Sequence, residues 1–310
     1  MASSIGIEFL LSVAGRASDL YGSPLGVSQT SDPAGWWRSS SLKEMASSFL
    51  LRVGTRGCAR RCGYTRSVSS DTSEPVYVAL GDSISIDEYA GGRGRGGASL
   101  LARNRDDDFP QWRGHDLVTR YPGLRYHLLA VDGGTTQTLL ESQLPRLEAA
   151  GLSPTVVTLT VGGNDLLGAY GDTMRARNVV HTVIVRVEQA LTRLARLMRS
   201  PDHAIVIGTV YDPSDGSADA ARLGLPPWPE VVDVLAELND GLRAVAAQHH
   251  ARIAEIHDQF LGHGLTVGNP AQSKPRPRNR ALWYCNVIEP NAWGADAVRA
   301  SFWHALHNAS

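Results

Sequence analysis

Residues 77–85 read YVALGDSIS, and this stretch decides the interpretation of the chain. An apolar run typical of a buried strand ends there in Gly81, Asp82 and Ser83. A strand that breaks into a small polar turn can present a serine hydroxyl at the edge of a sheet. The same pattern is common in ordinary turns, so the tripeptide gains meaning only together with motifs later in the chain.

Five short apolar runs succeed one another from residue 76 onward, and we expect each to be a buried strand. They cover residues 76–80, 126–131, 156–161, 204–210 and 252–256. Between them, apolar residues recur at steps of three and four over residues 180–198 and 231–245, which predicts amphipathic helices. This alternation predicts an α/β fold, a three-layer α/β/α sandwich of the flavodoxin-like kind with a central parallel sheet. A closing helix is expected after Asn291, a plausible N-cap.

Three residues that could take part in catalysis each come directly after one of these strands. They are Ser83, Gly133 in AVDGGTT (130–136) and Asn164 in VGGNDL (161–166). Ligands of such sheets bind at the carboxyl ends of the strands, so the three residues should share one edge. Ester hydrolysis by serine needs a nucleophile, oxyanion donors and a base. Ser83 would be the nucleophile, and its own amide, the Gly133 backbone and the Asn164 side chain would be the donors.

The blocks around Ser83, Gly133 and Asn164 resemble, in type and order, the first three blocks of the GDSL or SGNH hydrolase family. The resemblance implies the three-layer fold and hydrolysis of carboxylic esters through an acyl-enzyme intermediate, with no metal or organic cofactor. We expect a small-molecule ester with a small to medium acyl chain. Asp82, Gly163 and Asp165 lie next to Ser83 or Asn164 within these blocks and are expected to contact the substrate. A carbohydrate deacetylase or a thioesterase is an alternative within the same class.

The fourth block departs from the family. Its usual form is D-x-x-H-P-N, whereas this chain has Asn286 in place of the Asp and Glu289 in place of the His. A carboxylate at its reference pKa of about 4.3 lies roughly two units below a histidine, although burial raises such a pKa. An acid-shifted limb of the pH–rate profile would therefore indicate Glu289 as the base.

Other residues compete for the role of general base. His263 lies in the glycine-flanked sequence FLGHG, where Glu289 could orient it in a rearranged triad. His257 at the end of a strand is a weaker candidate. A third alternative is that the chain has no base at all and is a non-catalytic ligand-binding relative of the family.

Composition excludes other classes of function. The chain of 310 residues has a net charge of −1, with 30 basic against 31 acidic residues, so no overall field favours nucleic acid. No apolar run is long enough to predict a membrane span. Three cysteines, an odd number, predict no disulfide framework and a reducing compartment, and we expect a cytoplasmic protein. The sequence does not predict an oligomeric state.

The N-terminal part differs in kind from the rest. Residues 1–70 carry eight basic and four acidic side chains, and residues 46–70 are rich in Arg and Ser without any acidic residue. We predict a disordered basic leader or tail over residues 1–74 and a single hydrolase domain over residues 75–310. The leader is either dispensable or, by its composition, a transit peptide for import into an organelle.

Overall fold

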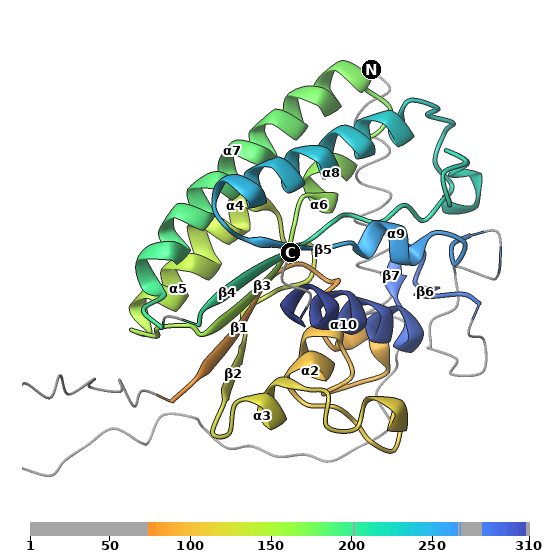
Figure 1. Cartoon of the computed structure of the whole chain (residues 1–310). Helices are drawn as coiled ribbons and strands as arrows, with labels where there is room; N and C mark the ends of the chain where they lie inside the picture. The colour runs from red at the N-terminus through yellow and green to blue at the C-terminus, as the bar shows by residue number, and fades with distance from the viewer. Residues whose placement is uncertain (1–73, 201, 266, 268–280, 308–310) are drawn as a thin grey trace, which may run out of the picture. The chain divides into compact units, whose positions relative to one another are not determined.

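The computed structural model of the chain describes residues 74–200, 202–265, 267 and 281–307. At its centre is a parallel sheet with the strand order β2-β1-β3-β4-β5 (Figure 1). The strands are β1 (Val76–Gly81), β2 (Arg125–Leu128), β3 (Val156–Thr160), β4 (Ala204–Gly208) and β5 (Arg252–Ala254). Each overlaps one of the predicted runs; β1 ends one residue later than predicted, at Gly81, and β2 begins one residue earlier, at Arg125. The expected leader lies outside the described residues except for Glu74.

Helices cover both faces of the sheet, so the predicted three-layer α/β/α fold is confirmed. Figure 1 shows one layer made of α4 (Thr136–Thr138), α5 (Leu144–Ala149), α7 (Thr173–Leu197) and α8 (Val231–Gln248). The other layer consists of α2 (Gly97–Ala102), α3 (Leu117–Arg120) and α10 (Ala292–His307). Two short helices, α6 (Gly163–Leu167) and α9 (Ile256–Phe260), come after β3 and β5.

The alternation of side chains along β1 produces the two cores. Val78 and Leu80 pack with the apolar faces of α7 and α8, whereas Tyr77 and Ala79 pack with α10. Each fully buried aliphatic side chain of this kind contributes roughly 1.5–3 kcal/mol. None of the described helices is long and apolar enough to cross a membrane.

Side-chain caps fix the first turns of α7 and α10. Asp172 accepts a hydrogen bond from the amide of Arg175 at 3.0 Å and begins α7. Asn291 begins α10 as predicted, because its Oδ1 accepts from the amides of Trp293 at 2.9 Å and Gly294 at 3.1 Å. Removal of such a cap costs about 1 kcal/mol.

Gly81 ends β1 in a conformation that only glycine adopts easily. Its φ is +119°, and a Cβ there would lie 1.8 Å from the carbonyl oxygen of Thr160 on the neighbouring strand. The side chain of Gln143 bonds to both backbone groups of Gly81, with Oε1 accepting from the amide and Nε2 donating to the carbonyl, each at 2.7 Å. The chain therefore turns out of the sheet directly before Ser83.

Replacing Gly81 with Ala should destabilise the fold by about 3 kcal/mol or more, because backbone strain adds to a clash with the backbone of β3. Gly151→Ala is the matched control: Gly151 also has a positive φ of 62°, but nothing lies within 4 Å of its Cβ position. The control should lose only about 1–2 kcal/mol. Denaturant unfolding measures both values, and equal losses would contradict this account of the turn.

Candidate active site

The turn after β1 buries Ser83 and, within the described part of the chain, leaves its backbone amide without an acceptor. Ser83 is 8% exposed, and the turn is closed by bonds from Ser85 N–H to Asp82 at 3.2 Å and from Ile86 N–H to Ser83 at 3.3 Å. Among the described residues, nothing accepts a hydrogen bond from the amide of Ser83. This N–H is therefore available to an oxygen atom that approaches the serine.

Asn164 and Ser83 line one cavity, as expected for residues at the same sheet edge. Asn164 lies in the first turn of α6, where Gly162 precedes the helix with a φ of +108°. One hydrogen of its Nδ2 is used, because Nδ2 donates to the carbonyl of Gly134 at 3.0 Å. The amide of Asn164 has a second hydrogen that it can donate to a substrate oxygen.

The loop after β2 contains two adjacent glycines with different constraints. Gly133 has a φ of +64° and open space around its Cβ position, so its backbone conformation, rather than crowding, favours glycine. At Gly134 a Cβ would lie 2.4 Å from the carbonyl oxygen of Gly81, so the loop comes too close to the end of β1 there for any side chain. No described residue accepts from the amide of Gly133. Counting only the described residues, Gly133 is therefore a second N–H without an acceptor, in the loop that approaches the end of β1 through Gly134.

Asp165 is not among the residues that line the cavity, although its neighbour Asn164 is. Its carboxylate accepts hydrogen bonds from the amide of Thr136 at 2.9 Å and from the hydroxyl of Thr136 at 2.6 Å. Arg186 lies 3.8 Å away on α7. Asp165 therefore joins the loop after β3 to the loop after β2. Gly163 and Asp82, the other two expected contacts, do line the cavity.

Glu289 reaches the serine from a small antiparallel hairpin of β6 (Tyr284–Cys285) and β7 (Glu289–Pro290). Asn286 and Val287 turn this hairpin with φ values of +42° and +78°. The hairpin is anchored from two sides. The buried Asn291 donates to the carbonyls of Leu282 and Tyr284, at 2.6 Å and 3.3 Å, and the Tyr211 hydroxyl donates to the carbonyl of Ile288 at 2.5 Å.

Burial raises the pKa of Glu289 to about 8. The interaction of its carboxyl group with the Ser83 side chain favours the charged form and lowers the pKa, whereas the negative charges of Asp132, Asp82 and Glu88 raise it further. The Oε2 atom of Glu289 is buried without a hydrogen-bond partner among the described residues. Burial is also the main cause that raises the pKa of Asp82 to about 7. The site thus holds two carboxyl groups with a high affinity for protons.

His263 has partners of its own away from Ser83. Its ring stacks on that of Trp283 with 3.6 Å between centroids, and its Nδ1 lies 2.9 Å from the carbonyl of Ala281. The carboxyl group of Glu289 interacts with the Ser83 side chain. His257 lies on α9 beside Asp258, with 3.1 Å between Nδ1 and Oδ1. Neither histidine is among the residues that line the cavity of Ser83, and Gly133 and Glu289 are not among them either.

Several residues that support the site belong to no recognisable sequence motif. Gln143 holds the end of β1, and it lies in the mixed polar and apolar stretch LLESQLPRL, where nothing sets it apart. Tyr211 holds the hairpin of Glu289 from the end of β4. Tyr89 interacts with the side chain of Asp132, and burial, followed by the charge of Glu289, raises the pKa of Tyr89. These contacts join segments that lie far apart in the sequence, which local patterns do not reveal.

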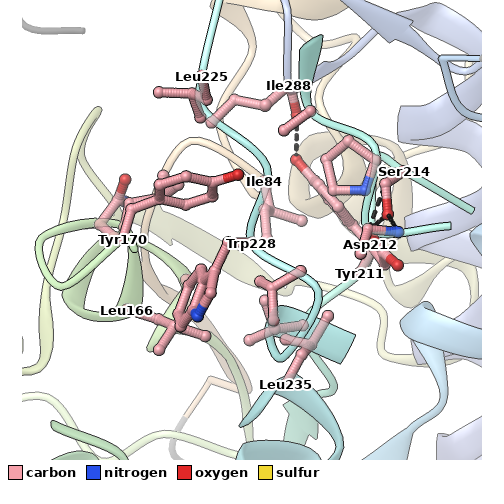
Figure 2. Close-up of a pocket in the computed structure, with 18 of the residues that line it drawn as sticks. Ile84, Leu166, Tyr170, Tyr211, Asp212, Ser214, Leu225, Trp228, Leu235 and Ile288 are labelled. Atoms are coloured by element: carbon pink, nitrogen blue, oxygen red, sulfur yellow. Dashed lines mark hydrogen bonds between the residues drawn. The ribbon is translucent and has the colours of Figure 1, made fainter. Parts of the chain in front are cut away.

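The cavity beside Ser83 has a volume of about 130 Å³ and mostly apolar walls. Figure 2 shows Tyr170 and Trp228 on one side of it and Tyr211 on the other, with the bond from Tyr211 to Ile288. The rings of Tyr170 and Trp228 meet edge to face at 5.0 Å. Among the described residues, no group of three or more His, Cys, Asp or Glu side chains is arranged to hold a metal ion.

The sequence profile of the GDSL-like lipase/acylhydrolase family matches residues 79–294, more than half of the chain. The chain therefore belongs to the GDSL-like lipase/acylhydrolase family, as its motifs indicated. Membership supports ester hydrolysis as the class of reaction. No curated protein matches the chain.

Solved structures of an esterase and a lipolytic enzyme are similar to this chain. A variant of an acetyl xylan esterase from Geobacillus stearothermophilus has a TM-score of 0.51 at 13% identity, over 75% of this chain and 94% of that chain. A phospholipase A1 from Streptomyces albidoflavus NA297 has a TM-score of 0.47 at 20% identity, over 75% of this chain and 100% of that chain. The likeness to the esterase concerns the fold and not the substrate.

Because the pKa of Glu289 is raised, we expect the free energy of unfolding to depend on pH. A carboxyl group whose pKa is raised in the folded state stabilises the fold fully below its unfolded-state pKa of about 4.3. This stabilisation is lost as the pH rises to the folded-state pKa of about 8. Glu289→Gln, which stays neutral, should therefore gain about 2 kcal/mol or more over the parent between pH 5 and pH 8.5.

Denaturant unfolding at the two pH values measures this difference. Glu230→Gln is the matched control, because Glu230 is exposed before α8, and it should change stability equally at both pH values. A Glu289→Gln effect that is the same at both pH values would contradict the buried, proton-binding state of Glu289.

Proposed function

We propose that the protein is a serine esterase in which Ser83 is the nucleophile and Glu289 is the general base. The observation that carries this proposal is the buried carboxyl group of Glu289 beside the Ser83 hydroxyl, with a pKa of about 8. A histidine has a reference pKa of about 6.5, so a glutamate in this environment binds a proton at least as strongly as the histidine that it replaces. The usual weakness of a glutamate base, its low pKa, is removed by burial.

In the first half-reaction the Glu289 carboxylate takes the proton of the Ser83 hydroxyl, and the Ser83 oxygen bonds to the ester carbonyl carbon. The carbonyl oxygen becomes an oxyanion, for which the amides of Ser83 and Gly133 and the side chain of Asn164 are the proposed donors. The carbonyl then re-forms and the bond to the alcohol oxygen breaks. Protonated Glu289 gives its proton to that oxygen, and an acyl-enzyme on Ser83 remains.

In the second half-reaction a water molecule attacks the acyl carbon, and Glu289 accepts the water's proton. Collapse of the second tetrahedral intermediate releases the carboxylic acid, and the proton returns from Glu289 to the Ser83 oxygen. Glu289 cycles between an anion and a neutral acid throughout. A histidine base would instead cycle between neutral and cationic forms, and the cationic form is the one that an acidic triad partner stabilises.

The neutral residue at position 286 agrees with this difference in charge. Asn286 stands where the family has an Asp, and the charges already near Glu289 are those of Asp132, Asp82 and Glu88. These anions favour proton uptake by Glu289, so the proposed base needs no further acidic partner. Asn also tolerates the positive φ of 42° at this position better than most residues.

Ser83→Ala should lower kcat/KM for a p-nitrophenyl ester of a short acyl chain by at least about a thousandfold, because no covalent intermediate can form. The assay compares purified parent and variant, with folding verified by circular dichroism. Undiminished hydrolysis by the variant would refute Ser83 as the nucleophile. A folded parent protein without esterase activity at any pH would instead favour a ligand-binding relative of the family.

The pH dependence of kcat/KM separates the candidate bases. The parent should gain activity as the pH rises, with an apparent pKa near 8, because Glu289 must lose its proton to act. The double variant Asn286→Asp/Glu289→His, which restores the family block, should move this apparent pKa to about 6.5. His263→Ala should retain the parent profile. A parent pKa of 6 to 7 that disappears in His263→Ala would identify His263 as the base instead.

A further inference from the structure

The cavity beside Ser83 extends from the polar site into the apolar core. At the site it is lined by Ser83 and Asn164, and its far wall contains Trp228 and Leu235, which are 3% and 6% exposed and belong to the core under α7 and α8. An acyl group on Ser83 would therefore have an apolar space next to it whose far wall belongs to the core. This space can therefore distinguish substrates by the length of their acyl group.

The far wall is held in place by its own contacts. The indole Nε1 of Trp228 donates to the Thr173 hydroxyl at 2.9 Å, and the Tyr170 hydroxyl donates to the carbonyl of Pro226 at 2.9 Å. Their rings pack edge to face (Figure 2). A wall that is fixed in this way sets a definite limit to the length of chain that fits.

The polar groups of the wall are already satisfied. The carboxylate of Asp212 accepts from the amide and the hydroxyl of Ser214, at 2.8 Å and 2.7 Å, and from the amide of Gly216 at 2.8 Å. Asp212 therefore closes its own turn rather than offering itself to a substrate hydroxyl. The space beyond Ser83 and Asn164 offers mainly dispersion contacts, which suit a hydrocarbon chain and not a sugar.

The volume limits the length of that chain. An apolar protein cavity of about 150 Å³ holds a molecule of the size of benzene, with six carbons, and the cavity here is about 130 Å³. An acetyl group would leave most of this space empty, whereas a dodecanoyl chain would exceed it. We propose that the cavity is an acyl-binding pocket that selects acyl chains of about six carbons.

This inference rests on the proposed function and predicts a chain-length profile. With p-nitrophenyl esters of acetic, butyric, hexanoic, octanoic and dodecanoic acid, kcat/KM should rise by about fourfold per methylene up to hexanoyl and fall for dodecanoyl. Equal values for the acetyl and hexanoyl esters would overturn the pocket's role.

Two substitutions should change the length of acyl chain that fits the cavity, in opposite directions. Ala220 is 6% exposed and lines the cavity, so Ala220→Leu should fill it and shift the optimum to acetyl or butyryl esters. Trp228→Phe should make room and shift the optimum to octanoyl. The matched control is Ala221→Leu at the exposed neighbouring position, which should keep the parent profile. An unchanged optimum in both Ala220→Leu and Trp228→Phe would refute the proposal.

Binding of an uncleaved ligand separates this inference from the esterase proposal. Calorimetry with the Ser83→Ala variant should detect hexanamide more strongly than acetamide by tenfold or more in Kd, and Ala220→Leu should remove this preference. Binding without hydrolysis in the parent would retain the pocket and refute the esterase. Hydrolysis without a chain-length preference in either assay would retain the esterase and refute the pocket.

Discussion

Burial of one carboxyl group beside a serine is the constraint on which the candidate site depends. The β6–β7 hairpin that carries Glu289 is anchored by the side chains of Asn291 and Tyr211. Burial of the Glu289 carboxyl group raises its pKa to about 8. The fold therefore sets both the position of the proposed base and its affinity for a proton.

The surrounding charges explain how a glutamate could replace a histidine in this family. A neutral histidine that takes up a proton becomes a cation and gains from an acidic partner. Glu289 begins as an anion among the anions Asp132, Asp82 and Glu88, and proton uptake relieves their repulsion. In the proposed mechanism the exchange of His for Glu and of Asp for Asn therefore belong together as one change in the charge of the site.

Much of the fold could be predicted from the sequence, because its elements are encoded locally. The central strands β1, β3 and β4 are short, mostly apolar and fully buried runs, α7 and α8 show helical periodicity, and Asn291 caps α10. The GDS and GGND motifs likewise located Ser83 and Asn164 at one sheet edge. These signals need no information about distant segments.

The remaining features depend on contacts between distant segments. A glycine-flanked loop made His263 a candidate, but its sequence did not show that its ring stacks on Trp283. Asp165 sits in a family motif, yet its role in joining two loops depends on its bonds to Thr136. An acid-shifted limb was expected for Glu289 from its reference pKa, and burial reverses that expectation. Burial is a property of the folded chain and cannot be read from one residue type.

Direct titration of the Glu289 carboxyl group tests the central claim most closely. The protein is labelled with ¹³C at the side-chain carboxyl of glutamate, and the Glu289 resonance is assigned by its absence in Glu289→Gln. Its chemical shift, followed from pH 3 to pH 10, should titrate with a pKa of about 8. A pKa near 4.3, the reference value of a solvated glutamate, would contradict the account.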